Sequence, residues 1–288
     1  MKSARYVHAC LGICLLLGVL PLLLRAEAQS LSDPLNYRGG LRISPDKYRL
    51  KEKQCQQLLA SLGEKTGFQE LGFDADGFLM LGNRQNFIGG SATARHLLMD
   101  AIDFPSQLLL EAHMHSSKVV FANLGKSTLY VNMRTGRQVE HQPIRIDFSD
   151  FGKLMGPKDV LASFDLGMTL LHELVHGVRK LHDSVNEWED VGDCERYVNT
   201  IRKELNLPER QQYIARSRTI HMPLGWTIKM AELQFARTDY RNGKLKTDEL
   251  ILSWDVNRVG VGDQESVSRT LSSTAAKKPE QKSTAAVQ

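Results

Sequence analysis

One helical segment constrains the fold of this chain more than any other part of the sequence. Residues 160–181 place apolar side chains at helical spacing, and His172, Glu173 and His176 lie within this run. Residues four apart in a helix share one face, so the two histidines can direct their imidazoles to the same point. The pattern therefore predicts a helix over residues 160–181 with an apolar back and a polar front.

The polar front of this helix has the residue types and the spacing of a zinc site. Two imidazole nitrogens one turn apart can bind one zinc ion, and a glutamate beside the first histidine can hold a water molecule and accept its proton. We therefore expect His172 and His176 to bind Zn²⁺ and Glu173 to act as a general base. The alternative is an ordinary surface helix that holds no metal.

A catalytic zinc ion needs a third protein ligand and one position left for water. Glu195 is the first candidate, because it follows His176 by nineteen residues and lies on a second predicted helix, residues 193–205. His182, six residues after His176, is the alternative ligand. It has the spacing of the metzincin third histidine, but Arg179 stands where that pattern has a glycine.

The residues that follow the motif resemble one known family. The segment His172–Gly177 is followed by Asn199-Thr200-Ile201-Arg202, then by Pro208-Glu209-Arg210 and by Tyr213. This order is similar to that of the NleD-like effector zinc metallopeptidases, in which the zinc-binding helix precedes an Asn-x-Ile-Arg segment, a Pro-x-Arg and a tyrosine. The resemblance is closest over residues 170–213. It implies an α+β, zincin-like fold with endopeptidase activity, in which a mixed sheet packs on the motif helix and the second helix supplies the third ligand.

These residues predict a zinc-dependent peptidase that hydrolyses peptide bonds of a protein or peptide substrate. Glu173 would accept the proton of the attacking water, and Tyr213 is a candidate second donor to the oxyanion, although a contact at a helix end would equally explain it. The strand predicted at residues 144–148 is a candidate edge for a substrate peptide. The competing hypothesis is a non-catalytic exported protein, with a binding role or with a structural zinc that has His182 as its fourth ligand.

The first 28 residues predict a secretory signal peptide. Lys2 and Arg5 precede an apolar run over residues 9–24, and Ala26-Glu27-Ala28 has the pattern of a cleavage site. We therefore expect an exported protein, periplasmic or extracellular, with no stable membrane association after cleavage. Two cysteines would remain, Cys55 and Cys194, either as one disulfide or as two thiols.

The rest of the chain predicts a single domain over residues 47–263. It lies between a flexible segment, residues 29–46, and a disordered tail, residues 264–288, which is rich in Ser, Thr, Ala, Lys and Gln. The formal net charge is only +4 and there is no basic stripe with aromatic residues, which argues against nucleic-acid binding. The further elements expected are helices over 47–62 and from Ser91 to about 102, a turn at 74–77 within 68–81, strands over 118–124, 128–133 and 144–148, and a hairpin about Asn242-Gly243 within 228–255.

Overall fold

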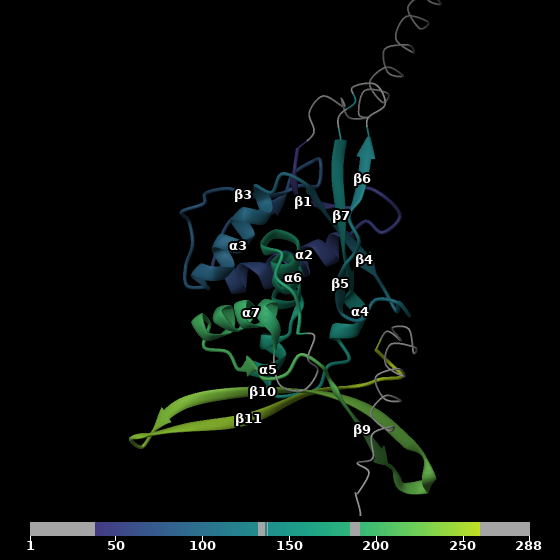
Figure 1. The fold of residues 1–288 in the computed structure, drawn as a ribbon, viewed down its shortest axis with the longest axis vertical. Coiled ribbons are helices and arrows are strands. Elements are labelled where there is room, and N and C mark those ends of the chain that lie inside the picture. The colour runs from purple at the N-terminus through teal and green to yellow at the C-terminus, as the bar shows by residue number, and fades with distance from the viewer. Residues whose placement is uncertain (1–37, 132–135, 137, 185–190, 260–288) are drawn as a thin grey trace, which may run out of the picture.

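The computed structural model describes residues 38–131, 136, 138–184 and 191–259 (Figure 1). The predicted signal peptide and the predicted C-terminal tail lie outside the described residues. Within them, helices and mixed sheets alternate along the chain, which confirms the predicted α+β class. No helix in the described part of the chain is both long enough and apolar enough to span a bilayer.

A five-stranded main sheet supports the helix that carries the motif. Its strand order is β1-β4-β7-β5, with β6 also paired to β7 beyond the end of β5. β1 and β7 run parallel to β4, whereas β5 and β6 run antiparallel to β7. The strands are β1 (Gly40–Ile43), β4 (Gln107–His113), β5 (Ala122–Leu124), β6 (Thr128–Val131) and β7 (Gln138–Asp147).

Two of our sequence-based expectations are wrong in this sheet. Residues 40–43 fall in the segment expected to be flexible, yet they form β1, which pairs with β4 and buries Leu41 and Ile43. The predicted strand at residues 144–148 ends β7, which is paired on both sides and therefore has no free edge for a substrate. Both errors concern strand pairing between distant segments, which a local pattern does not report.

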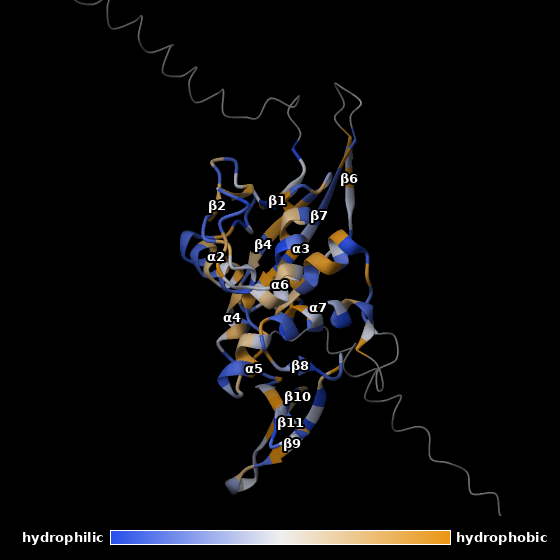
Figure 2. Cartoon of the chain, turned by 90° about the vertical axis from the view of Figure 1, so that its left-hand side faces the viewer, coloured by the Kyte–Doolittle hydropathy of each residue, from blue (hydrophilic) through white to orange (hydrophobic). Residues whose placement is uncertain are grey.

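The four helices of the main core, α2, α3, α6 and α7, lie to one side of the main sheet (Figure 1). α6 is central: it packs against α2, α3 and α7, and the main core includes residues of all four helices and of the sheet. In Figure 2 the apolar residues gather along α6 and β4 in the middle of the molecule. The helices are α2 (Glu52–Thr66), α3 (Ala92–Ile102), α4 (Phe148–Phe151), α5 (Lys158–Ser163), α6 (Leu166–Leu174), the π-helix η1 (Val175–Arg179), α7 (Gly192–Glu204) and the 3-10 turn η2 (Pro223–Gly225).

A second sheet lies beside α5 and α7 and has its own apolar core. It is built on a long antiparallel hairpin, whose turn is Asn242-Gly243 as predicted. Phe235, Leu252 and Trp254 are among the buried residues of this second core. Its strands are β8 (Glu209–Arg210), β9 (Arg216–His221), β10 (Thr227–Arg241) and β11 (Lys244–Asp255); the separate small hairpin predicted around residues 74–77 is β2 (Leu71–Phe73) with β3 (Leu79–Leu81).

The predicted helix over residues 160–181 is divided into three. The first part, α5, ends at Ser163, and Asp165 begins α6 by accepting a hydrogen bond from the backbone N–H of Met168 at 2.9 Å. After Leu174 the backbone widens into η1. π-helical turns are frequent at functional sites, and this one contains the second histidine of the motif. The other predicted helices correspond to α2, which begins later and ends later than expected, to α3 and to α7.

Candidate metal centre

The motif histidines meet at the junction of α6 and η1. His172 lies in the last turn of α6 and His176 lies in η1, and their Nε2 atoms are 3.1 Å apart. Nδ1 of His176 is 2.7 Å from the carbonyl oxygen of Leu181, so that ring is oriented by the backbone that follows it. The two Nε2 atoms therefore face one point, as the four-residue spacing predicts.

Two further side chains complete a cluster around this point. Asp183 places Oδ1 3.3 Å from Nε2 of His172 and Oδ2 3.1 Å from Nε2 of His176. Sγ of Cys194 lies 3.6 Å from Nδ1 of His172. One donor atom from each of these four residues lies within 4.8 Å of the other three, so the group could hold a metal ion. Imidazole, carboxylate and thiolate are all donors that zinc accepts.

Neither Asp183 nor Cys194 is among the ligands predicted from the sequence. Asp183 directly follows His182, the alternative third ligand, and the signal that could have found it is its position just after the helix that carries the motif. For Cys194 the sequence left two alternatives, a disulfide with Cys55 or a thiol, and neither included a metal. Both cysteines are free in the structure, with Cys194 fully buried and Cys55 partly exposed.

Glu195, the predicted third ligand, lies beside the cluster and not in it. Its carboxylate is fully buried, and Oε2 is 3.1 Å from Nδ1 of His172, the ring nitrogen that faces away from His176. Arg202 and Arg210 also pair with this carboxylate, and Asn199 accepts hydrogen bonds from both arginines. A carboxylate on the far nitrogen of a histidine fixes its tautomer and ring orientation for a metal on the near nitrogen.

The two remaining candidates, His182 and Tyr213, lie near the cluster in different ways. His182 lines a cavity of ≈ 450 Å³ next to His176, but its ring is not one of the four clustered donors. Tyr213 stacks its ring on that of His172 with centroids 6.2 Å apart, and its hydroxyl group hydrogen-bonds to Asp183. Tyr213 therefore lies against the candidate metal position, and its role as an oxyanion donor stays a prediction.

The clustered groups shift one another's pKa in directions that favour a cation between them. Burial lowers the pKa of His172, but hydrogen bonds to Asp183, Cys194 and Glu195 outweigh it and raise the pKa well above its ordinary value. Burial opposes a similar rise at His176, whose hydrogen bond with Asp183 brings its pKa to about 10. Burial also opposes the change at Asp183, where the two histidines hold the pKa below its usual range. A divalent ion can take the place of the protons that these groups attract.

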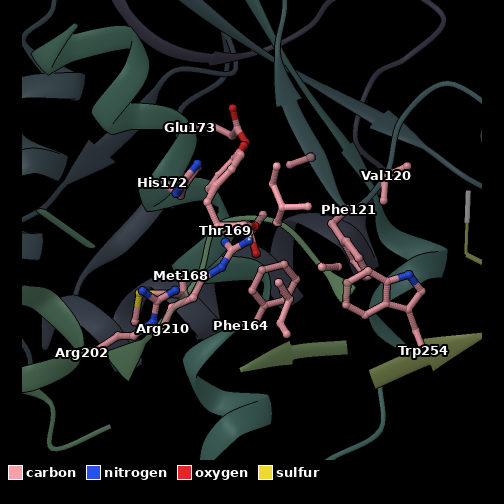
Figure 3. A pocket seen from close by; sticks show the side chains of 15 residues that line it. Val120, Phe121, Phe164, Met168, Thr169, His172, Glu173, Arg202, Arg210 and Trp254 are labelled. Carbon is pink, nitrogen blue, oxygen red and sulfur yellow. Dashed lines mark hydrogen bonds between the residues drawn. The ribbon is translucent and has the colours of Figure 1, made fainter. Parts of the chain in front are cut away.

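Glu173 lies between two cavities that open on the cluster. Its side chain is 6% exposed, and burial raises its carboxyl pKa, while the two neighbouring histidines lower it. One cavity is the ≈ 450 Å³ space already described, which also contacts Leu124 at the end of β5. The other, of ≈ 250 Å³, extends from His172 and Glu173 toward Phe121 and Trp254 (Figure 3). A buried carboxyl group of raised pKa at the meeting of two cavities can transfer a proton to or from a bound molecule.

Comparison of the chain with known protein families, with curated proteins and with solved structures gives no match.

Proposed function

We propose that this protein is a zinc-dependent metallopeptidase with a zincin-like active site. The observation that carries the proposal is the convergence of His172 Nε2, His176 Nε2 and the Asp183 carboxylate on one point beside the Glu173 carboxyl group. Two histidines and a carboxylate are a ligand set of hydrolytic zinc sites, and the cavities give a substrate access to it.

His172, His176 and Asp183 would hold the ion in this proposal. When bound there, zinc supplies a Lewis acid that polarises a carbonyl group and makes water a nucleophile near neutral pH. Glu195 keeps Nε2 of His172 free for the metal by occupying Nδ1. Arg202 and Arg210 in turn form ion pairs with the buried Glu195 carboxylate. The carboxylate can therefore stay ionised in the interior, because its charge is compensated.

Glu173 would be the proton carrier of the reaction. It would take a proton from the water that attacks the carbonyl carbon and pass it to the leaving nitrogen. Burial raises the pKa of this carboxyl group, which makes the carboxylate a stronger proton acceptor than an exposed glutamate. The Tyr213 hydroxyl group, directed at Asp183 in the free protein, would donate to the developing oxyanion.

β5 is the edge to which we propose that a substrate adds. It pairs with β7 on one side only, and its residues Ala122 and Leu124 border the two cavities beside Glu173. An extended peptide that hydrogen-bonds to this edge would pass over Glu173 and the histidines. A protein or peptide substrate fits this geometry, and the export predicted from residues 1–28 would place the reaction outside the cytoplasm.

The proposal is tested by measuring metal content and cleavage in the same preparations. We expect about one zinc per chain in the purified protein, by elemental analysis, and hydrolysis of fluorescein-labelled casein that a chelator abolishes. Glu173→Gln should keep the zinc and reduce cleavage at least about 100-fold, because the amide cannot accept the proton. Full activity of Glu173→Gln would overturn the assignment.

Cys194 favours a second candidate function, a structural zinc site. Its sulfur is near enough to join the two histidines and Asp183 as a fourth ligand, which would leave no position for water. Cys194→Ser distinguishes the two cases. In the peptidase the variant keeps both zinc and cleavage, whereas a structural site with a thiolate ligand would lose zinc affinity and thermal stability together.

A further inference from the structure

We propose that the ≈ 250 Å³ cavity beside Glu173 selects substrates with a bulky apolar side chain directly after the cleaved bond. This inference rests on the proposed function. To the proposed peptidase it adds a pocket that determines specificity, the kind of side chain that fills the pocket, and the position of that side chain in the substrate. The cavity is drawn in Figure 3, where His172 and Glu173 lie at one side and Phe121, Phe164 and Trp254 lie toward the other.

One side of the cavity is a wall of packed aromatic rings. Phe121 packs edge-on against Phe164 and Trp254, with ring centroids 5.2 and 5.1 Å apart, and Leu233 of the second core completes this side. A cavity of about 150 Å³ lined by apolar residues is enough to bind benzene. The space beside Glu173 is larger, so it can take a phenyl or an indole ring.

Phe121 is held in a backbone conformation that bulky residues rarely adopt. Its φ is 59°, in the left-handed region, where a side chain such as this one strains the backbone. Hydrogen bonds hold the residue there: its N–H donates to the Asp150 carboxylate at 3.3 Å, and its carbonyl oxygen accepts from the N–H of Asp147 at 2.8 Å. Such strain concentrates at functional sites. In this protein the left-handed conformation directs the Phe121 ring to the wall of the cavity, immediately before β5 begins.

The charges at the cavity disfavour a basic occupant. Arg202 and Arg210 both line it, and these two cations share one buried carboxylate, Glu195. Within the described part of the chain, Glu173 is the one acidic residue among those that line the cavity. A lysine or arginine side chain would therefore meet two guanidinium groups and apolar walls, so its burial would be unfavourable.

The direction of β5 assigns the cavity to one side of the cleaved bond. The strand runs from Ala122, at the aromatic cavity, to Leu124, at the cavity that contains His176 and His182. Antiparallel pairing is the more stable arrangement for an added strand. A peptide in that direction passes first by Leu124 and then by Ala122. The aromatic cavity therefore receives the residue on the carboxyl side of the bond.

A binding experiment tests this pocket without requiring turnover. Trp188→Phe with Trp226→Phe leaves Trp254 as the single tryptophan, and its fluorescence is followed during titrations of the zinc-loaded protein. The ligands are the N-phosphoryl derivatives of phenylalaninamide, alaninamide and lysinamide, in which a zinc-binding phosphoryl group precedes the side chain as the cleaved carbonyl precedes the next residue of a substrate. We expect the phenylalanine compound to bind about tenfold or more tightly than the alanine compound, because a buried aromatic side chain gains apolar contact. The lysine compound should bind no more tightly than the alanine compound.

A matched pair of substitutions assigns the preference to this cavity. Ala215→Leu, just before β9, narrows the cavity and should remove the advantage of phenylalanine, whereas Ala236→Leu, in β10 and outside the cavity, should preserve it. Equal binding of the three compounds, no binding of any of them, or an unchanged preference in Ala215→Leu would overturn the pocket. Casein cleavage without such a preference would refute the pocket alone, whereas the preference without cleavage would refute the peptidase and leave the pocket in place.

Discussion

At the residue scale, the metal centre separates side chains that would bind the ion from side chains that would position a ligand. Asp183 faces Nε2 of both histidines, whereas Glu195 faces Nδ1 of His172 alone. His182 lines the neighbouring cavity without joining the cluster. These three residues thus have three different positions relative to the two histidines, and each position predicts a different change in zinc affinity.

We expect Asp183→Ala to lose most of its zinc, Glu195→Gln to weaken zinc binding about 10- to 100-fold, and His182→Ala to change it little. The effect of Glu195→Gln is intermediate, because the amide still contacts Nδ1 of His172 but no longer carries the charge that orients this ring. Titration of each purified variant against a chelator of known affinity measures the three constants. Stoichiometric, tightly bound zinc in Asp183→Ala, with loss in His182→Ala, would reverse these assignments.

At the element scale, local patterns predicted the elements that depend on neighbours in the chain. Ser91 caps α3 and Asn242-Gly243 turns the long hairpin because each is a local interaction. Asp165 is a common N-cap residue and could have indicated the break between α5 and α6, but the apolar periodicity of the sequence continues through this position. Asp183 could not be assigned from sequence, because its approach to the histidines depends on how the chain turns after η1.

At Gly167 the backbone of α6 lies so close to α2 that a side chain has no room. A Cβ atom at Gly167 would lie 2.6 Å from Oγ of Ser61 and 2.8 Å from its carbonyl carbon, and the backbone cannot move aside without separating the helices. We expect Gly167→Ala to lower the free energy of unfolding by about 1–3 kcal/mol, despite the better helix propensity of alanine. Urea denaturation measures this. Gly152→Ala is the control, because that glycine has φ of −72° and no atom within 4 Å of the added carbon.

Glu204, the last residue of α7, connects that helix to the start of α3. Its carboxylate accepts hydrogen bonds from the Ser91 hydroxyl at 2.6 Å and from the N–H of Thr93 at 3.0 Å. Burial raises the pKa of this carboxyl group, but the hydrogen bonds together outweigh burial and hold the pKa below its usual value. A lowered carboxyl pKa stabilises the fold above the pKa of the unfolded chain, about 4.3, and this contribution disappears as the pH falls through the folded value.

Glu204→Gln should therefore destabilise the protein at pH 6 and have progressively less effect toward pH 3. Because the carboxylate is largely exposed, we expect a loss of about 1 kcal/mol or less at pH 6. Urea unfolding of both proteins at pH 6, 4 and 3 gives the difference. The same loss at all three pH values would mean that the charge of Glu204 does not contribute.

At the scale of the whole molecule, the candidate centre joins segments that the chain keeps apart. Its four side chains come from α6, from η1, from the segment before residue 185 and from α7, and the ≈ 250 Å³ cavity beside it is lined by residues of both the main sheet and the second sheet. An ion held here would add one more link to the hydrogen bonds and ion pairs that already join these elements. Its binding should therefore stabilise the folded chain as a whole, because the unfolded chain does not assemble the site.

Zinc in a thousandfold excess over its dissociation constant would add about 4 kcal/mol to the free energy of unfolding. For a protein of this size, that corresponds to a rise of roughly 10 °C in Tm. Thermal unfolding followed by circular dichroism, with zinc and with a chelator, measures the difference. His176→Ala removes a ring of the cluster and should abolish the rise, whereas His221→Ala, on exposed β9, should retain it. An equal zinc-dependent rise in His176→Ala would place the ion elsewhere in the molecule, and the same Tm with zinc and with chelator would mean that these four side chains bind no zinc.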